Sequence, residues 1–305
     1  MNKTKTVIII VGPTASGKTE LSLQLASHFN TSIISADSRQ CYKELNIGVA
    51  KPTAEALHSI KHYFISSHSI LDNVNAQVFG EYALNAAEEI FTHNDIAIMV
   101  GGTGMYIKAF CDGFDEIPEV KSAVRENIIT AYKKKGLAWL QNEVQKKDPV
   151  FWMNAEQKNP QRLMRALEVI NSTGNSITSF QKNKKISRLF QTIKIGIQLQ
   201  KEQLYANIDT RIDKMIQDGL IEEVRSLKPY KNLNALQTVG YKEIFKYLDE
   251  NISFEEAVKQ IKINTKQYAK RQLTWFKKDY SVEWLSFNFS DKSKTKIYIQ
   301  QLLHP

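Results

Sequence analysis

The sequence predicts an α/β protein: a core built on a parallel sheet, with an all-helical domain inserted into it. A β-branched apolar run at residues 7–11 leads into a glycine-rich loop and then a helix-like segment. Strand-like runs at residues 32–36, 62–65 and 96–100 alternate with helix-like segments, which is the pattern of a parallel sheet. From residue 116 to residue 190 the strand-like runs stop and only helical patterns remain.

The first loop reads Gly12-Pro13-Thr14-Ala15-Ser16-Gly17-Lys18-Thr19, which has every fixed position of the phosphate-binding pattern G-x-x-x-x-G-K-[ST]. The glycines let the backbone curl around an anion, Lys18 supplies a positive charge, and the Thr19 hydroxyl is a ligand for Mg²⁺. We therefore expect a P-loop NTPase-like core. The motif alone leaves open which ligand carries the phosphate.

The strand expected at residues 32–36 ends in Asp37-Ser38-Arg39-Gln40, and in an open α/β sheet the carboxyl ends of the strands face the ligand. P-loop enzymes that use ATP usually have an acidic Mg²⁺ residue at the end of another apolar strand. Here residues 96–100 run into two glycines instead, and Asp95 lies at the opposite end of that strand. Asp37 is therefore the best-placed carboxylate, as an outer-shell metal residue or as a base, unless it only caps the following turn.

The insertion is predicted to be helical, with Asn159 as an N-cap and Gly136 and Gly174 as helix ends. Its helices are expected at residues 120–135, 137–147 and 161–173. Sheet character returns at residues 191–200, and the remainder is predicted to be helical to the end. The chain is accordingly divided into residues 1–115, the first part of the core, residues 116–190, the helical insertion, and residues 191–305, the second part of the core.

A capping box at residues 253–256 predicts the start of a long C-terminal helix. Its packing stripe is predicted to contain Phe254, Val258, Ile261, Thr265, Tyr268, Gln272 and Phe276. Its opposite face is predicted to carry Lys259, Lys262, Lys266, Lys270 and Lys277. This lysine face is either an RNA-binding surface or an ordinary solvated one.

Composition limits the class of protein. The 305 residues are 42% hydrophobic, enough for a full core and long for one domain. The run at residues 7–11 is too short to cross a bilayer and the N-terminus lacks the features of a secretory signal, so we expect a cytoplasmic protein with no membrane partner. Two distant cysteines, Cys41 and Cys111, exclude a disulfide framework. The net charge of +9 fits a polyanionic partner, although lysine-rich composition alone can have no functional meaning.

Seven blocks, in order and spanning nearly the whole chain, resemble the tRNA dimethylallyltransferases, also called tRNA isopentenyltransferases. The blocks lie at residues 12–19, 37–40, 47–53, 101–106, 162–168, 239–243 and 269–276. We expect the bacterial type, without the zinc finger of eukaryotic relatives. Two departures from the family pattern are Val49, where a threonine is usual, and residues 156–159, which read Glu-Gln-Lys-Asn where many relatives have His-Pro-Asn-Asp.

The resemblance implies transfer of a dimethylallyl group from its diphosphate to N6 of adenosine-37 in tRNAs that read codons beginning with U. The products are N6-dimethylallyladenosine and diphosphate. It places the donor diphosphate, not ATP, in the P-loop, which is consistent with the missing acid after residue 100. The implied cofactor is Mg²⁺, and the implied partners are dimethylallyl diphosphate and the tRNA anticodon stem-loop, whose arm the insertion would grip. No obligate protein partner is evident, and we expect a monomer.

The same resemblance assigns site residues. The catalytic residues are Asp37, Lys18, Thr19 and Arg211. The donor diphosphate is assigned to Gly12, Thr14, Ala15, Ser16, Gly17, Lys18, Thr19 and Arg211, and the metal to Thr19. The tRNA is assigned to Asp37, Ser38, Arg39, Gln40, Thr103, Arg125, Gln161, Arg162, Leu163, Met164, Arg165, Lys270 and Arg271. In this scheme the P-loop stabilises the leaving diphosphate and Asp37 takes the amine proton. Arg211 could instead be a surface helix arginine, and Thr103 could only close a turn.

Two other classes of function fit parts of the sequence. One is a P-loop enzyme acting on a small acceptor, either a kinase or an adenylate isopentenyltransferase. The other is an RNA-binding module with a vestigial P-loop. The helical insertion and the basic C-terminal helix argue against a mononucleotide acceptor, because such a substrate would not require them.

Overall fold

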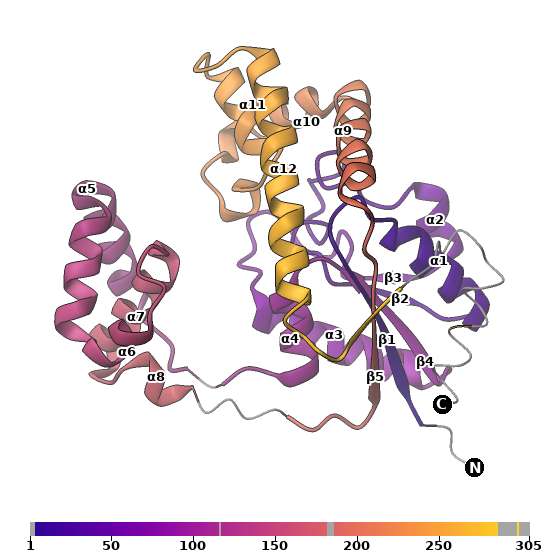
Figure 1. Ribbon diagram of the computed structural model, residues 1–305, viewed down its shortest axis with the longest axis horizontal. Helices are drawn as coiled ribbons and strands as arrows, with labels where there is room; N and C mark the ends of the chain where they lie inside the picture. Colours follow the sequence, from indigo (N-terminus) through magenta and orange to yellow (C-terminus); the bar gives the residue numbers. More distant parts are fainter. Residues whose placement is uncertain (1–3, 116, 182–185, 286–297, 299–305) are drawn as a thin grey trace. The chain divides into compact units, whose positions relative to one another are not determined.

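The computed structural model describes residues 4–115, 117–181, 186–285 and 298. Within these residues, six strands form one parallel sheet in the order β3-β2-β4-β1-β5-β6 (Figure 1). The strands are β1 Thr6–Val11, β2 Ile33–Ser35, β3 His62–Tyr63, β4 Ile96–Gly101, β5 Gln191–Gly196 and β6 Val282–Trp284.

Strand β1 lies at the centre of the sheet and is buried along its whole length. Ile8 and Ile10 pack on one face against α1 (Lys18–Phe29), and Val7 and Ile9 pack on the other face with α3 (Ala76–Phe91) and α4 (Gly104–Asp112). Because both faces are covered, the strand reads as a continuous apolar run instead of an alternating one. In the register of the sheet, Val11 pairs with Gly101 of β4 and Gly196 of β5, which brings three strand ends to one edge.

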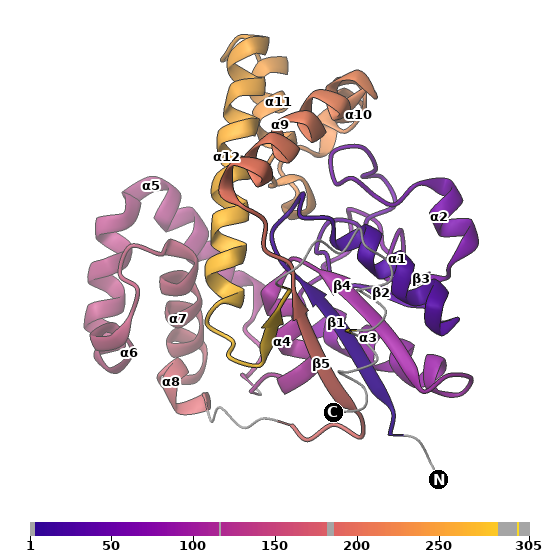
Figure 2. The ribbon, with the colours of Figure 1, turned by 45° about the vertical axis from the view of Figure 1, so that its right-hand side comes forward.

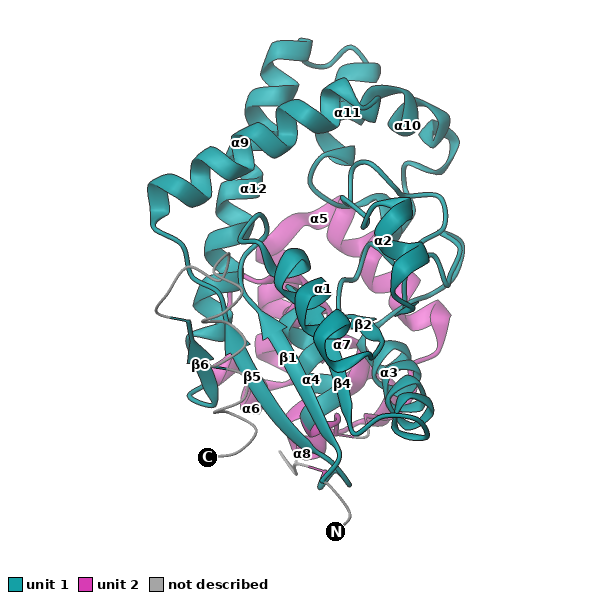
Figure 3. Cartoon of the chain, turned by 90° about the vertical axis from the view of Figure 1, so that its right-hand side faces the viewer, with its two compact units in different colours: residues 1–111, 187–305 teal, residues 112–186 magenta. Residues whose placement is uncertain are grey.

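The chain divides into two compact units (Figure 3). Unit 1 is Met1–Cys111 with Ser187–Pro305, and unit 2 is Asp112–Ile186. The expected division fell at residues 115/116 and 190/191. Besides the sheet and its covering helices, unit 1 contains α2 (Ala54–Ser59), α9 (Lys201–Gln217), α10 (Leu220–Ser226), the short helices η1 (Lys228–Tyr230) and η2 (Asn234–Leu236), α11 (Tyr241–Leu248) and α12 (Phe254–Phe276). Helices α9 to α12 gather beyond the carboxyl ends of the central strands (Figures 1 and 2).

Unit 2 is a helical body with its own core. It contains α5 (Ser122–Lys147), α6 (Pro149–Asn154), α7 (Pro160–Thr173) and α8 (Ile177–Phe180). Helix α5 is broken at Gly136, whose φ of 76° and ψ of −172° are not helical, so the expected helix end at this glycine is confirmed. The expected caps of α7 are also confirmed: Asn159 accepts a hydrogen bond from the Arg162 amide at 3.3 Å, and Gly174 is left-handed with φ 73°.

The predicted fold class is confirmed, but the end of the chain differs from the prediction. Residues after 200 were expected to be helical, whereas Val282–Trp284 form β6 and pair with β5. A three-residue strand carries too little periodicity to be recognised, and its partner lies almost 90 positions earlier in the sequence. The strand expected at residues 191–200 ends at Gly196. Residues after 285, except Tyr298, lie outside the described part, and among the described residues no helix is long and apolar enough to cross a bilayer.

Candidate active site

The P-loop joins the end of β1 to the start of α1. Gly12 has a φ of 147°, and a Cβ atom there would lie 2.6 Å from the carbonyl oxygen of Ile197, so only glycine fits without a shift of the backbone. Gly17 is left-handed and caps α1 without a side-chain hydrogen bond. The first amides of α1 therefore remain available to an anion, as at other phosphate-binding helix N-termini.

Lys18 and Ser16 suit this loop to a phosphate group. Burial, together with the nearby Arg211 charge, lowers the pKa of Lys18 to about 7, and the Asp37 charge opposes this shift. The Lys18 ammonium donates to the carbonyl oxygen of Pro13 at 2.5 Å. Ser16 Oγ is buried and has no hydrogen-bond partner among the described residues. A phosphate oxygen would accept a hydrogen bond from this hydroxyl. Its negative charge would also stabilise the charged form of the buried Lys18.

Asp37 reaches the same site from the end of β2. Its Oδ1 accepts hydrogen bonds from the backbone amides of Arg39 and Gln40 at 2.8 and 3.3 Å. The capping role considered from the sequence is thus present, but it uses only one carboxylate oxygen. Among the described residues, no hydrogen bond to Oδ2 is formed. Asp37 also interacts electrostatically with Lys18 and Arg211, so its carboxylate lies near both cations.

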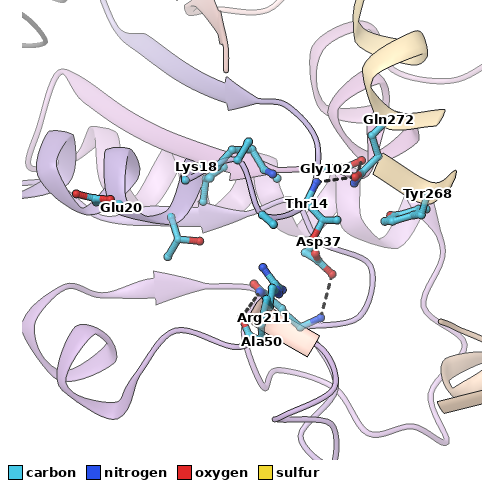
Figure 4. A pocket seen from close by; sticks show the side chains of 16 residues that line it. Thr14, Lys18, Glu20, Asp37, Ala50, Gly102, Arg211, Tyr268 and Gln272 are labelled. Carbon is cyan, nitrogen blue, oxygen red and sulfur yellow. Dashed lines mark hydrogen bonds between the residues drawn. The ribbon is translucent and has the colours of Figure 1, made fainter. Parts of the chain in front are cut away.

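These groups line one cavity of about 320 Å³ (Figure 4), within the size range of small-molecule sites. Nine of the residues assigned from the sequence line it: Thr14, Ala15, Ser16, Gly17, Lys18, Thr19, Asp37, Gln40 and Arg211. Arg211, which extends from α9, forms no ion pair with any described residue, and burial lowers its pKa. The alternative that Arg211 is an ordinary surface arginine does not fit this position.

Two side chains of α12, Tyr268 and Gln272, also line the cavity, although the apolar spacing predicted both as packing residues. Gln272 accepts a hydrogen bond from the Thr14 amide at 2.8 Å and donates one to the Gly102 carbonyl oxygen at 3.0 Å. It therefore ties the P-loop to the loop after β4. A buried polar residue in an apolar helical stripe was the signal for this contact.

The Asp37 segment and Thr103 form a connected group. The Thr103 hydroxyl accepts a hydrogen bond from the Ser38 amide at 3.1 Å, and it also interacts with the hydroxyl of Tyr268. Burial raises the pKa of Tyr268 to about 12, so this phenol stays protonated. The Arg39 side chain is not part of this group. Its guanidinium donates to the carbonyl oxygens of Asn234 and Ala235 at 2.9 and 3.2 Å. The structure thus gives the Arg39 side chain an anchoring role within unit 1.

The assigned residues of unit 2 lie on α5 and α7. Glu168 is buried and pairs with Arg165 at 3.3 Å and with Arg125 at 3.7 Å, so it orients two of the assigned arginines. Gln161 and Arg162 are exposed. Leu163 and Met164 are buried in the core of unit 2, and their side chains pack instead of offering a surface.

The lysine face predicted for α12 is wrong in part. Lys262 and Lys266 do not point freely into solvent: they pair with Asp213 and Asp209 of α9 at 2.6 and 2.8 Å. The two aspartates are four residues apart, as are the two lysines, so the pairs stack along the packed helices. Lys270 is exposed, as is Arg271, whose guanidinium lies 5.8 Å from the ring centre of Tyr268.

Metal binding would depend on the ligand. Among the described residues, no group of three or more histidine, cysteine, aspartate or glutamate side chains could hold a metal ion. Thr19 lines the cavity in the first turn of α1. One hydroxyl beside a phosphate site fits Mg²⁺, which keeps several waters and takes substrate phosphate oxygens as ligands.

The fold and the cavity define a P-loop α/β protein in which a loop suited to a phosphate group lies beside a carboxylate from the end of β2. Residues 40–279 match the family model described as IPP transferase. A tRNA dimethylallyltransferase of Christiangramia forsetii is 45% identical over 287 residues, covering 94% of this chain and 95% of that protein. The chain therefore belongs to the IPP transferase family, and it is an enzyme of the transferase class.

Two solved structures extend this likeness over the whole fold. The full-length tRNA isopentenylpyrophosphate transferase of Bacillus halodurans has a TM-score of 0.72 and 32% identity, covering 98% of this chain and 97% of that chain. A eukaryotic dimethylallyltransferase described as acting on tRNA has a TM-score of 0.77 and 26% identity, covering 97% of this chain and 78% of that chain. The resemblance inferred from the seven sequence blocks is thereby confirmed.

Proposed function

We propose that the protein transfers a dimethylallyl group from dimethylallyl diphosphate to N6 of adenosine-37 in tRNAs that read codons beginning with U. The observation that carries this proposal is the placement of Lys18, Arg211 and Asp37 around one cavity. Two cations suit a diphosphate, and a carboxylate beside them suits an acceptor that must lose a proton. Family membership supplies the identity of the two substrates.

On the donor side, the bond between C1 of the dimethylallyl group and the diphosphate oxygen breaks, and its electron pair leaves with the diphosphate. Lys18, Arg211 and the amides at the start of α1 are the groups that would stabilise the developing negative charge. Ser16 offers a buried hydroxyl, without a partner among the described residues, for a further phosphate oxygen. Mg²⁺, held by Thr19 and the phosphate oxygens, would neutralise additional charge on the leaving group.

On the acceptor side, the adenine N6 forms the new bond to C1 while the C–O bond breaks. The N6 amine becomes acidic as the C–N bond forms, and we assign its proton to Asp37, whose Oδ2 makes no hydrogen bond within the described residues. Tyr268 is an aromatic side chain at the cavity, and we assign to it stacking on the flipped base.

The tRNA backbone requires cationic contacts outside the cavity. We assign these to exposed Lys270 and Arg271 of α12 in unit 1, and to Arg125, Gln161, Arg162 and Arg165 of unit 2. The glutamate that holds Arg125 and Arg165 leaves much of both side chains exposed, at 62% and 42%. Such phosphate contacts position an RNA without reading its sequence. Because the acceptor is tRNA, we expect the enzyme to act in the cytoplasm.

The proposal is tested by incubating the protein with Mg²⁺, labelled dimethylallyl diphosphate and either AMP or unmodified tRNA. We expect label on tRNA only, at the adenosine 3′ of the anticodon. Label on AMP would favour the adenylate isopentenyltransferase instead. RNA binding that is independent of the donor, without any modified base, would favour the RNA-binding module.

A further inference from the structure

A loop that borders the cavity is held by a carboxylate from a distant helix. Glu223 of α10 accepts three backbone hydrogen bonds: from Asn46 at 3.0 Å and Ile47 at 2.8 Å to Oε2, and from Gly48 at 3.0 Å to Oε1. Oε1 also accepts the hydroxyl hydrogen of Tyr241 at 2.5 Å. One carboxylate therefore fixes three consecutive amides, and charge-assisted bonds of this kind are among the stronger ones.

A cation connects the same loop to the segments around Tyr42 and Ser66. The Lys51 ammonium donates to the carbonyl oxygen of Tyr42 at 2.6 Å, to Asn46 Oδ1 at 3.1 Å and to Ser66 Oγ at 2.8 Å. Asn46 thus joins the two charges, since its amide contacts Glu223 and its side chain contacts Lys51.

Packing allows the carboxylate to come this close. A Cβ atom on Gly48 would lie 2.6 Å from the ring of Tyr241, so the ring rests directly on the glycine backbone. Burial and the adjacent Glu223 raise the pKa of Tyr241, which therefore remains a hydrogen-bond donor. Tyr241 therefore packs against Gly48 and also donates to the carboxylate that binds the loop.

The loop in turn orients a side chain of the cavity. The Gln40 side-chain amide donates to the carbonyl oxygens of Val49 at 3.3 Å and Ala50 at 3.0 Å, and its oxygen accepts from Ser35 Oγ at 3.1 Å. Gln40 and Ala50 both line the cavity. Residues 35, 49 and 50 thereby fix the orientation of the Gln40 side-chain amide.

We infer that Glu223 is a positioning residue for the acceptor side of the cavity, acting through residues 46–50 on the side chain of Gln40. This inference rests on the proposed transfer to adenosine. The donor side is held by different contacts: Gln272 binds Thr14, and Asn207 donates to the Ala15 carbonyl oxygen at 3.2 Å. Loss of the Glu223 carboxylate should therefore impair transfer to the acceptor adenosine and leave binding of the donor diphosphate unchanged.

The test compares Glu223→Gln with Glu222→Gln, a neighbouring exposed glutamate on α10 whose nearest cation, Arg225, is 4.0 Å away. Donor affinity is measured by titration calorimetry, and transfer to tRNA is measured in single turnover with saturating donor. For Glu223→Gln we expect transfer efficiency to fall about tenfold, as for loss of one charge-assisted bond, with donor affinity within about twofold of wild type. Glu222→Gln should match wild type in both measurements. Wild-type transfer by Glu223→Gln, or an equal loss of donor affinity, would overturn the inference.

A second measurement keeps the inference separate from the proposed function. Amide hydrogen exchange at residues 46–48 should speed up at least about tenfold in Glu223→Gln, while exchange at residues 14–18 stays unchanged. If Glu223→Gln does not fold, Tyr241→Phe removes one of the four bonds and should shift transfer and exchange in the same direction by less. A wild-type protein that does not modify tRNA would refute the proposed function. Unchanged exchange at residues 46–48 in the variant would refute the positioning role.

Discussion

The two sides of the cavity are built differently. The donor side is mostly one contiguous stretch, residues 12–19, whose glycines and helix start form an anion site from local backbone geometry. The acceptor side collects Asp37, Gln40, Ala50 and Tyr268 from separate segments. A phosphate can be held by backbone amides alone, but a base must be placed to within a fraction of an ångström relative to the donor carbon. The acceptor side therefore depends on contacts between distant parts of the chain.

The largest effect should come from the carboxylate that only the acceptor requires. Asp37→Asn keeps an oxygen that can accept from the Arg39 amide but removes the base, so we expect single-turnover transfer to fall about 10²–10⁴-fold. Asp95→Asn is the matched control, because Asp95 lies at the opposite end of the strands and pairs with Lys5 at 2.7 Å. A rate for Asp37→Asn within tenfold of wild type would remove the base assignment.

A pH effect should mark the donor side. The pKa of free Lys18 is lowered to about 7, and a bound diphosphate favours its charged form, so donor binding above pH 7 must take up a proton. Donor affinity should then fall by up to about tenfold per pH unit above 7. In the unfolded chain Lys18 keeps its proton up to its ordinary pKa of 10.5, whereas in the folded protein it loses the proton near pH 7. The contribution of Lys18 to the free energy of unfolding of the donor-free protein therefore rises as the pH increases from about 7 to 10.5.

Calorimetry in buffers of different ionisation enthalpy measures this proton uptake directly. At a pH of about 8.5 we expect nearly one proton per donor bound to wild type, because most free Lys18 is then neutral. Lys18→Arg should show almost none, since arginine stays charged. Equal uptake by both proteins would assign the proton to another group.

A smaller effect should appear where Gln272 ties the P-loop to the loop after β4. Gln272→Leu leaves the Thr14 amide and the Gly102 carbonyl without their partner, so we expect the free energy of unfolding to fall by about 1–3 kcal/mol. Gln267→Leu, an exposed position on the same helix, should stay within about 0.5 kcal/mol of wild type. Equal denaturation midpoints for the two variants would contradict a stabilising role of the Gln272 hydrogen bonds to Thr14 and Gly102.

The smallest effect concerns RNA contacts on α12. Lys270→Gln should reduce the slope of log K against log salt for tRNA by about one, the expected loss of a single phosphate contact. Lys266→Gln should leave the slope unchanged, because Lys266 is paired with Asp209. If the two variants change the slope equally, the distinction between free and paired lysines on this helix is wrong for RNA binding.

The sequence predicted the local features of the fold well. The P-loop pattern, the buried strands and the glycine helix ends each depend on neighbouring residues, and β1, α1 and the caps of α7 form as expected. The features of the fold that the sequence did not predict depend on contacts between distant parts of the chain. Strand β6 is defined by its pairing with β5, and Lys262 is neutralised by a helix some 50 positions away.

The candidate site follows the same division. Residues 12–19 were assigned directly from spacing, whereas Tyr268 and Gln272 were taken for packing residues because they fall on an apolar stripe. Glu223 gave no signal, since the loop that it holds lies more than 170 positions earlier. Resemblance to a family transfers residue roles, but only the structure shows that Arg39 is engaged with the backbone at Asn234.

The central claim is that donor and acceptor are held by separable parts of one cavity, and crossed binding measurements test it most directly. Donor affinity, tRNA affinity and single-turnover transfer are determined for Lys18→Met and Asp37→Asn under identical conditions. We predict that Lys18→Met loses donor affinity and still binds tRNA, while Asp37→Asn binds donor as wild type does and fails to transfer the dimethylallyl group. Loss of donor affinity in both variants would contradict the account.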